Sequence, residues 1–569
     1  MTIPRAEYPR PQFKRNEWLN LNGIWEFSIN SLENGITEGY LENASLNSEI
    51  TVPFCPESKL SGIEHTDFMD CVWYKRSFIL PDGWLKEGRR THINIGACDY
   101  LTYIYVNSKQ AGLHRGGYTS FSFDITSFVN EGENIIAICA EDNFRSGKQP
   151  SGKQSPQKES FGCFYTRTTG IWQTVWLENT PDAYIASIKM TPDIHTQELL
   201  IEAECINASG KTLSATALFE GKETGNAVCI VYGDSARITL KLSELHLWSL
   251  ESPLLYDLKL KLDNDEVTSY FGMRNVYYSD HCFYLNDKPI FQRLVLDQGF
   301  YPDGIYTAPT DEDLKNDILL SKAMGFNGAR LHQKIFEERF LYYCDILGYM
   351  VWEEHANWGL QNGNDYAQKA FLPEWLEALK RDYNHPAIIG WCPFNETDNV
   401  PDGSALSDAY KLTKAFDRTR PVIDTSGWTR TEKTDMEDAH DYDQNPKSFK
   451  ARYESLREDK TVNYGLVPWM PTLPPELCFI SEYGGIWWNP NDESGWGYGE
   501  RVKNTEEFIE RYKGLTEAIL ENSKFCAFCY TQLTDVEQEQ NGLYTYNRVP
   551  KFNVEIIRKI NTMKAAIEE

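Results

Sequence analysis

Residues 310–352 read TDEDLKNDILLSKAMGFNGARLHQKIFEERFLYYCDILGYMVW, and this stretch shows the same pattern twice. Thr310 with Asp313 three positions later is a capping-box pattern that predicts the start of a helix, and Gly325 is placed to end it. The remaining periodicity predicts a second helix over 337–347 and strands over 326–331 and 349–352. Two consecutive helix–strand units favour a parallel sheet with helices packed on its outer face.

The same alternation of strand and helix extends outward from this stretch, from about residue 277 to residue 569. Six further strand candidates lie at 291–296, 388–394, 421–425, 436–440, 477–480 and 525–531. Eight strands in a segment of this length predict a (β/α)8 barrel. The segments 443–476 and 484–505 are expected to be long barrel loops.

The part of the chain before the barrel is rich in strands. Between residues 118 and 126, Phe121 and Phe123 alternate with polar residues, which is the period of a half-buried strand. The polar residues 144–160 are expected to form a long loop. The predicted domains, in a multidomain fold with β and α/β parts, are a jelly-roll-like β-sandwich over 1–182, an immunoglobulin-like β-sandwich over 183–276 and the barrel over 277–569.

The composition argues against several classes of function. The 56 Lys and Arg residues against 83 Asp and Glu give a net charge of −27, which disfavours binding to nucleic acid or to anionic membranes. No run of about 18 apolar residues occurs, so no membrane span is expected. The N-terminal residues lack the apolar segment of a signal peptide, which favours a cytoplasmic protein, with a trimmed secretory signal as the alternative. Thirteen scattered cysteines predict mostly free, buried thiols, and neither a metal site nor a cofactor is predicted.

Two glutamates stand where a barrel enzyme carries its catalytic groups, at the carboxyl ends of predicted strands. Glu396 ends the segment IIGWCPFNE, and Glu482 lies in LCFISEYGG, 86 positions later. Three repeats of about thirty residues separate them, which places them on the fourth and seventh strands, across the barrel mouth from each other. Glycoside hydrolysis needs two facing carboxyl groups, because one attacks the anomeric carbon while the other donates a proton to the leaving oxygen. A solvated surface glutamate is the alternative for either residue taken alone.

Eight segments spread along the chain carry a further signal. In chain order they are YPRPQFKRNEWLNLNGIWEF, VWYKRSF, HRGGYTSFSFDIT, TTGIWQTVWLE, FGMRNV, ARLHQ, NE and SEYGG. Short pieces such as NE are weak alone, but the order of all eight resembles glycoside hydrolase family 2, which includes β-galactosidases, β-glucuronidases and β-mannosidases. This resemblance implies two sandwiches and a barrel, a carbohydrate substrate and a retaining mechanism. The oligomeric state is not predicted from the sequence, and a homo-oligomer is an alternative by analogy with the family alone.

The resemblance also implies roles for four residues. In a retaining mechanism, Glu482 is the nucleophile and Glu396 is first the general acid and then the general base. Arg330, at the end of the second strand, matches the family's arginine and favours the ionised form of the nucleophile. Asn395 matches the residue that contacts the sugar 2-hydroxyl.

Further substrate-binding candidates lie after strands at the barrel mouth. Both His440 and Tyr442 follow the sixth strand, where family members place an aromatic residue beside the sugar or the nucleophile, and Tyr442 is the candidate chosen. The other candidates are His332 and His355, which follow the second and third strands, and Trp428 and Trp487 in mouth loops. The alternative is a surface or loop position for His332 and a packing role for either tryptophan.

The sugar is the least determined feature. β-Glucuronidases resemble one another in an Asn-x-Lys-Gly segment after the eighth strand, whose lysine contacts the uronate carboxylate. The corresponding stretch here is Glu539-Gln540-Asn541-Gly542. A glutamate beside a uronate would be repulsive, so a neutral hexoside is favoured, with a β-galactoside first. The alternatives are a β-glucuronide or galacturonide, a β-mannoside and an arabinoside or furanoside. A non-catalytic carbohydrate-binding protein is the hypothesis from a different class.

Overall fold

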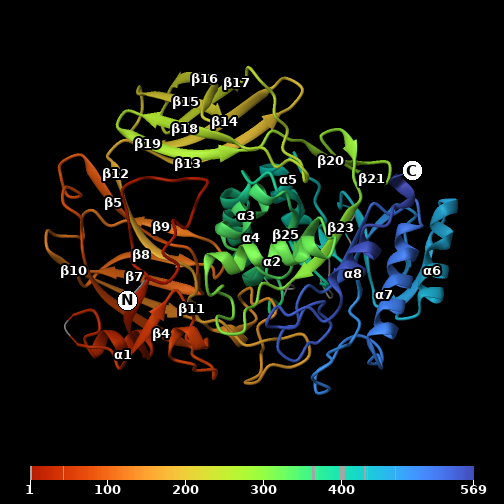
Figure 1. Ribbon diagram of the computed structural model, residues 1–569. Coiled ribbons are helices and arrows are strands. Elements are labelled where there is room, and N and C mark those ends of the chain that lie inside the picture. Colours follow the sequence, from red (N-terminus) through yellow and green to blue (C-terminus); the bar gives the residue numbers. More distant parts are fainter. Residues whose placement is uncertain are drawn as a thin grey trace.

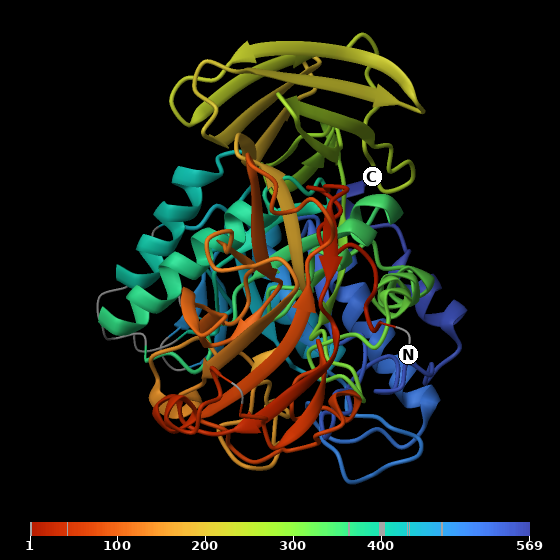
Figure 2. The same ribbon diagram turned by 90° about the vertical axis from the view of Figure 1, so that its left-hand side faces the viewer.

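The computed structural model describes residues 3–42, 44–361, 365–397, 404–428, 431, 433–467 and 470–568. They form an N-terminal β-sandwich, a second β-sandwich and a barrel, coloured from red to orange, yellow to green, and green to blue (Figure 1). In the view turned by 90°, the N-terminal sandwich lies in front of the barrel and the second sandwich lies above both (Figure 2). Each has a hydrophobic core. The predicted architecture of two sandwiches and a barrel is confirmed.

The N-terminal sandwich packs a six-stranded sheet against a four-stranded one. The larger sheet has the order β3 (Ser48–Val52), β2 (Gly23–Ile29), β4 (Cys71–Ile79), β10 (Glu133–Glu141), β7 (Leu101–Val106) and β8 (Lys109–Arg115). The smaller sheet has the order β1 (Trp18–Asn20), β12 (Val175–Pro181), β5 (Arg89–Ile95) and β9 (Phe121–Asp124). All pairs of neighbours in both sheets are antiparallel. A short helix, α1 (Leu32–Thr37), follows β2.

The second sandwich is built from strands with a clean alternation of buried and exposed residues. One sheet contains β13 (Tyr184–Asp193), β14 (Glu198–Ile206) and β17 (Ser235–Lys241). The other contains β16 (Lys222–Ile230), β15 (Thr212–Phe219), β18 (Tyr256–Leu262) and β19 (Asp265–Phe271). In β18, Leu258, Leu260 and Leu262 are buried while Lys259 and Lys261 are exposed, so one face of each sheet fills the core between them. Three short strands, β20 (Val276–Ser279), β21 (Cys282–Leu285) and β22 (Lys288–Pro289), lead into the barrel.

The barrel is a curled parallel sheet. Seven strands pair in the order β26 (Ile388–Cys392), β25 (Met350–Glu354), β24 (Gly328–Leu331), β23 (Gln292–Asp297), β33 (Ala527–Thr531), β32 (Leu477–Gly484) and β29 (Glu437–Asp441). The pairing of the first strand with the last one in the chain, β23 with β33, curls the sheet. A separate parallel pair, β27 (Phe394–Asn395) with β28 (Thr425–Ser426), supplies the remaining part of the wall.

The helices of the barrel alternate with these strands along the chain. They are α2 (Asp311–Ala323), α3 (Glu338–Leu347), α4 (Asp365–Asp382), α5 (Ser404–Phe416), α6 (Pro446–Tyr453), α7 (Thr505–Leu520) and α8 (Val554–Asn561). The capping box of Thr310 and Asp313 is present at the start of α2. Gly348 ends α3 with a φ of 64°, a left-handed conformation that glycine adopts at low cost.

Two expectations for the barrel are wrong in detail. The segment 443–476 is not a loop, because it contains α6 and an antiparallel hairpin of β30 (Val462–Val467) and β31 (Met470–Leu473). The fifth strand is β28 and begins at Thr425, later than predicted. Before it, Val422 makes an isolated bridge to Trp391 and donates its N–H to the Asp435 carboxylate, so no regular ladder forms there.

The polar loop at 144–160 crosses from the N-terminal sandwich to the barrel. Ser151 and Gly152 donate their backbone N–H groups to the carbonyl of Trp358 at 2.8 and 3.1 Å, and Gln361 donates its own to Gly147 at 2.9 Å. Trp358 and Gln361 follow the third barrel strand. The loop is therefore hydrogen-bonded to the barrel and places sandwich residues at its mouth.

Two further predictions concern cysteines and membrane spans. All thirteen cysteines are free, and eleven of them are buried, including Cys526 and Cys529. Among the residues described here, no helix combines the length and the hydropathy that crossing a bilayer requires.

Candidate active site

The site forms where the barrel strands end. Glu396 directly follows β27, and Glu482 lies on β32. One carboxylate oxygen of each lies within 4.8 Å of the other and of a ring nitrogen of His440. Retaining glycosidases hold their two carboxyl groups about 5–5.5 Å apart, whereas inverting ones need about 6.5–9.5 Å for a water molecule. The structure therefore brings the two predicted glutamates together at the shorter spacing.

Glu482 lies among positive charges. Its Oε1 accepts a hydrogen bond from Arg330 Nη1 at 3.1 Å and lies 3.4 Å from His440 Nε2, while its Oε2 accepts one from the hydroxyl of Tyr442. Burial alone would raise the pKa of Glu482, but the charges of His440 and then Arg330 outweigh it and lower that pKa from 4.5 to about 2. Glu482 is thus held as a carboxylate, the form that a nucleophile needs.

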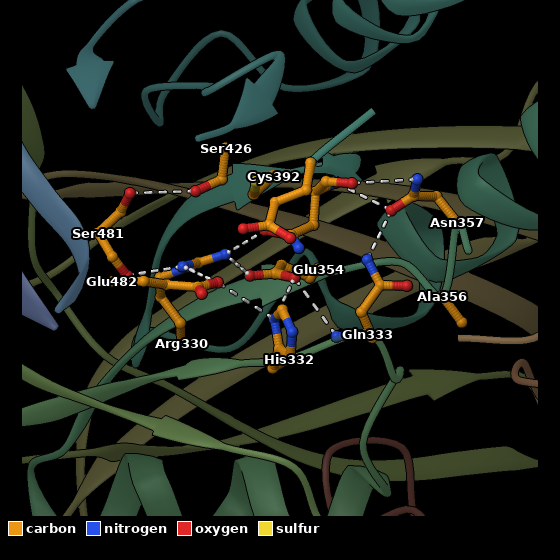
Figure 3. A network of polar contacts seen from close by, with 12 residues as sticks. Arg330, His332, Gln333, Glu354, Ala356, Asn357, Cys392, Ser426, Ser481 and Glu482 are labelled. Atoms are coloured by element: carbon orange, nitrogen blue, oxygen red, sulfur yellow. Dashed lines mark hydrogen bonds and ion pairs between the residues drawn. The ribbon is translucent and has the colours of Figure 1, made fainter. Parts of the chain in front are cut away.

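Arg330 is fixed on both sides by carboxylates (Figure 3). Its Nη1 contacts Glu482, and its Nη2 donates to Glu354 and, at 3.1 Å, to the side-chain oxygen of Asn395. His332 lies next to the same two glutamates, with its Nδ1 3.0 Å from Glu354 Oε1 and 4.0 Å from Glu482 Oε1. Burial lowers the pKa of His332 and outweighs the attraction of Glu354. The predicted Arg330 and His332 therefore lie at the site, beside Glu482 and Glu354.

Glu354 is a site residue that the sequence analysis missed. It is fully buried at the end of β25, and burial would raise its pKa, but Arg330 and His332 lower it. The doublet Glu353-Glu354 at the end of a predicted apolar strand was a usable signal, because such a strand end faces the barrel mouth.

Glu396 has a simpler environment. Its Oε1 lies 2.6 Å from His440 Nδ1, and its backbone N–H donates to the carbonyl of Ser426 at 2.9 Å. Its φ is 42°, in the left-handed region that residues other than glycine seldom adopt, and this turns the side chain after the short strand β27.

His440 contacts the carboxylates of both Glu396 and Glu482, although the sequence analysis chose Tyr442 instead. Its ring lies 2.6 Å from Glu396 and 3.4 Å from Glu482, and its Nε2 is 2.9 Å from the hydroxyl of Ser426. Burial lowers the pKa of His440, but Glu482 and Glu396 together raise it above 6.5. The three side chains also have a spacing that a metal ion could share, the only such group among the described residues. Arg330 and a protonated His440 oppose a further cation there.

Aromatic side chains line the mouth around these groups. The ring of Tyr442 stacks on Tyr498, with centroids 3.4 Å apart and planes at 3°. Tyr498 belongs to the loop 484–505. The predicted Trp428 is half-buried and packs against the barrel core. Trp487 is also half-buried, and its Nε1 has no hydrogen-bond partner among the residues described. A role for either tryptophan in binding sugar stays a prediction.

His355 lies away from the two glutamates. It is fully buried, with its ring 4.7 Å from Phe371 and 6.0 Å from Trp375, both on α4. Burial lowers the pKa of His355 from 6.5 to about 3, so the ring is neutral. The prediction that His355 binds substrate is at odds with this position. Successive residues of a strand point to opposite sides, and Glu354 takes the inward direction.

Two groups near the mouth come from outside the predicted set. Glu539, after β33, is buried and accepts hydrogen bonds from the Tyr165 hydroxyl and, at 2.9 Å, from Asn541 Nδ2. Burial raises the pKa of Glu539. Lys153 comes from the sandwich loop, and its Nζ lies 3.9 Å from the ring centre of Trp358. Lys153 had no signal in the sequence beyond its place in a polar loop.

Comparison with protein families matches three consecutive parts of the chain. Residues 19–181 match the sugar binding domain of glycosyl hydrolases family 2, residues 183–274 match a further domain of glycosyl hydrolases family 2, and residues 278–463 match its TIM barrel domain. These matches cover most of the chain.

Individual relatives give the same family. The chain is 29% identical over 427 residues to a putative beta-glucuronidase of Formosa agariphila, covering 71% of this chain and 49% of that protein. It is 25% identical to the beta-glucuronidase of Felis catus, covering 73% and 69%. A beta-galactosidase of Thermoanaerobacter pseudethanolicus is 26% identical and covers 63% and 48%. The chain thus spans about half the length of the first and third of these relatives.

Solved structures confirm the fold. The beta-D-glucuronidase of Dictyoglomus thermophilum superposes with a TM-score of 0.78 at 21% identity, over 99% of this chain and all of that chain. A beta-glucuronidase from Ruminococcus gnavus gives a TM-score of 0.80 at 16% identity, over 98% of this chain. On the three consecutive domain matches, the chain belongs to glycoside hydrolase family 2.

Proposed function

We propose that the protein is a retaining exo-acting β-glycosidase. The observation that carries this proposal is the spacing of Glu396 and Glu482, within 4.8 Å between one oxygen of each, with Glu482 held ionised. Glu482 attacks the anomeric carbon and forms a covalent glycosyl ester, while the bond from that carbon to the leaving oxygen breaks. Glu396 donates its proton to that oxygen. Glu396 then removes a proton from a water molecule, which attacks the ester and releases the sugar with retained configuration.

Asn395 is placed to assist at the sugar 2-hydroxyl. Its Oδ1 accepts a hydrogen bond from Arg330 at 3.1 Å. Its Nδ2 is buried and has no partner in the part of the chain that the structure describes. A buried amide without a partner costs free energy, so this N–H group is available to a substrate hydroxyl. Hydrogen bonds to the 2-hydroxyl strengthen in the transition state.

A β-glucuronide is the substrate class that the relatives favour. The first two relatives described above are named as β-glucuronidases, and so are both solved structures. The expectation of a neutral hexoside, which came from Glu539 in place of a lysine, has less support than this alternative. It remains the second candidate, because Glu539 is buried near the mouth and one relative is named as a beta-galactosidase.

A panel of 4-nitrophenyl glycosides tests these proposals. It contains the β-D-glucuronide, β-D-galacturonide, β-D-glucoside, β-D-galactoside, β-D-mannoside and α-L-arabinofuranoside, with product configuration followed by NMR. We expect the highest kcat/KM for the β-glucuronide and a product of retained configuration. A higher value for the galactoside would overturn the uronide preference alone. Binding without turnover of any glycoside would overturn the hydrolase and favour a carbohydrate-binding protein.

A further inference from the structure

We propose that Lys153, from the N-terminal sandwich, binds the carboxylate of a uronide substrate at the barrel mouth. This inference rests on the uronide preference proposed above and extends it, because it names the group that recognises the acid. In this proposal, Lys153 takes the place of the lysine that is missing from the segment after the eighth strand.

The first argument is that Lys153 is a buried cation without an anionic partner. The residue is 6% exposed. Within the described ranges, its Nζ makes no hydrogen bond and has no carboxylate oxygen within 4.0 Å. It lies over the face of Trp358, 3.9 Å from the ring centre. A buried ammonium group is costly unless it is paired, and an aromatic face compensates only in part. The side chain is thus ready to receive a carboxylate.

The second argument is the direction in which the ammonium group lies. The indole of Trp358, against which the ammonium group packs, donates its Nε1–H to the backbone carbonyl of Asn395 at 3.1 Å. Asn395 directly precedes Glu396. Burial lowers the pKa of Lys153, but Cys163 and the nearby carboxylates of Glu539, Glu396 and Glu482 raise it overall. The ammonium group therefore lies beside the tryptophan that contacts the segment leading to Glu396, and it stays charged at neutral pH.

The third argument is that the loop holds this position firmly. Gly152 precedes Lys153 and has a φ of 57°, and a Cβ there would lie 2.4 Å from the carbonyl oxygen of Gln333. The backbone thus approaches the barrel as closely as only glycine permits. On the other side, the carbonyl of Lys153 accepts the N–H of Tyr165 at 2.7 Å. A fixed cation binds a carboxylate without the entropy cost of ordering a mobile loop.

Glu539 does not remove this charge. Its carboxylate is already hydrogen-bonded by Tyr165 and Asn541, and it is farther than 4.0 Å from Lys153 Nζ. It is also largely buried, which raises its pKa and reduces the repulsion of a uronate. The repulsion expected from the sequence is therefore opposed by a cation from another domain.

The variant Lys153→Met tests the inference, because it keeps the length of the side chain and removes the charge. The matched substrates are 4-nitrophenyl β-D-glucuronide and β-D-glucoside, which differ in the carboxylate. We expect kcat/KM for the glucuronide to fall about ten- to hundredfold, the range of a charge-assisted hydrogen bond, and that for the glucoside to change less than about threefold. Lys153→Arg should recover most of the loss. Lys158→Met, in the same loop but exposed, should leave both substrates unchanged.

Four results would overturn the inference. If Lys153→Met lowered kcat/KM equally for both substrates, Lys153 would have a structural role. The same would follow if Lys153→Met and Lys153→Arg both lowered the thermal stability of the protein. An unchanged glucuronide rate in Lys153→Met would reject Lys153 while the uronidase activity of the wild-type protein stood. A wild-type protein that hydrolyses neutral glycosides but no uronide would reject the proposed substrate, and this inference with it.

Discussion

Glu396 and Glu482, the two glutamates proposed to be catalytic, lie within 4.8 Å of each other but in different surroundings. Glu482 is part of a barrel strand and contacts the guanidinium group of Arg330 at 3.1 Å, the ring of His440 at 3.4 Å and the hydroxyl of Tyr442. Glu396 follows a two-residue strand, and in the described part of the chain its one side-chain hydrogen bond is to His440.

This difference separates the two roles. Several donors and positive charges around one carboxylate stabilise its ionised form, which is what a nucleophile requires. Among the described residues, Glu396 has a single side-chain partner, with its Oε1 2.6 Å from His440 Nδ1, and in the proposed mechanism it donates a proton to the leaving oxygen as the glycosidic bond breaks.

The largest effect is expected for Glu482→Gln. It removes the nucleophile while keeping the shape of the side chain, so kcat/KM should fall at least about a thousandfold for every glycoside, whatever its leaving group. The measurement is kcat/KM on activated and unactivated glycosides. Azide added to Glu482→Gly should restore turnover and give a glycosyl azide of inverted configuration. Near wild-type activity of Glu482→Gln would reject the assignment of the nucleophile.

Glu396→Gln should have the second largest effect, and one that depends on the substrate. Loss of the general acid should lower kcat/KM about a hundred- to a thousandfold for an alkyl glycoside, but much less for a 4-nitrophenyl glycoside, whose leaving oxygen needs little protonation. Azide should increase the turnover of the activated substrate by Glu396→Ala and give an azide of retained configuration. Equal losses on both substrates would mean that the two glutamates do not differ in role.

The positions of these glutamates could be predicted because a barrel brings the carboxyl ends of its strands together. The spacing along the chain was enough to place Glu396 and Glu482 opposite each other. Arg330 and Tyr442 followed from the resemblance to the family. Within a single domain, the order of strands therefore carries most of the information about the site.

Contacts between domains could not be predicted in this way. Lys153 lies 243 positions before Glu396 and reaches the mouth only because its loop is hydrogen-bonded to the barrel. The side to which a residue points at a strand end was also undetermined. His332 and His355 both follow strands, but one contacts Glu354 at 3.0 Å and the other packs against α4. One residue of offset reverses the direction of a side chain on a strand, and sequence cannot fix strand ends that closely.

His440→Gln tests the residue that joins the two glutamates. Glu482 and Glu396 together raise the pKa of His440 above 6.5 against the effect of burial, which favours the protonated ring. Without that charge the pKa of Glu482 should rise from about 2, because His440 is the first of the charges that lower it. We expect kcat/KM to fall about tenfold and its acidic limb to move to higher pH. The cationic or titratable side chains that remain beside Glu482 include Arg330 and His332, and burial lowers the pKa of His332. A pH profile of unchanged shape would show that His440 only fills space.

The smallest effect on activity is expected for His355→Phe, which distinguishes a histidine that contacts the glutamates from one that does not. The ring of His355 packs against Phe371 and Trp375, so kcat/KM at pH 7 should stay within about threefold of the wild-type value.

The effect of His355→Phe should appear in the stability of the protein instead. The pKa of His355 is lowered from 6.5 to about 3 in the folded protein, so the unfolded chain binds a proton there that the folded chain does not. This contribution to the free energy of unfolding is complete above pH 6.5 and is lost as the pH falls from 6.5 towards 3. The variant lacks the group, so its free energy of unfolding should fall less steeply over that range when both proteins are unfolded with urea at a series of pH values. Equal slopes would show that His355 is protonated in the folded state, and a large loss of activity at pH 7 would place it at the site after all.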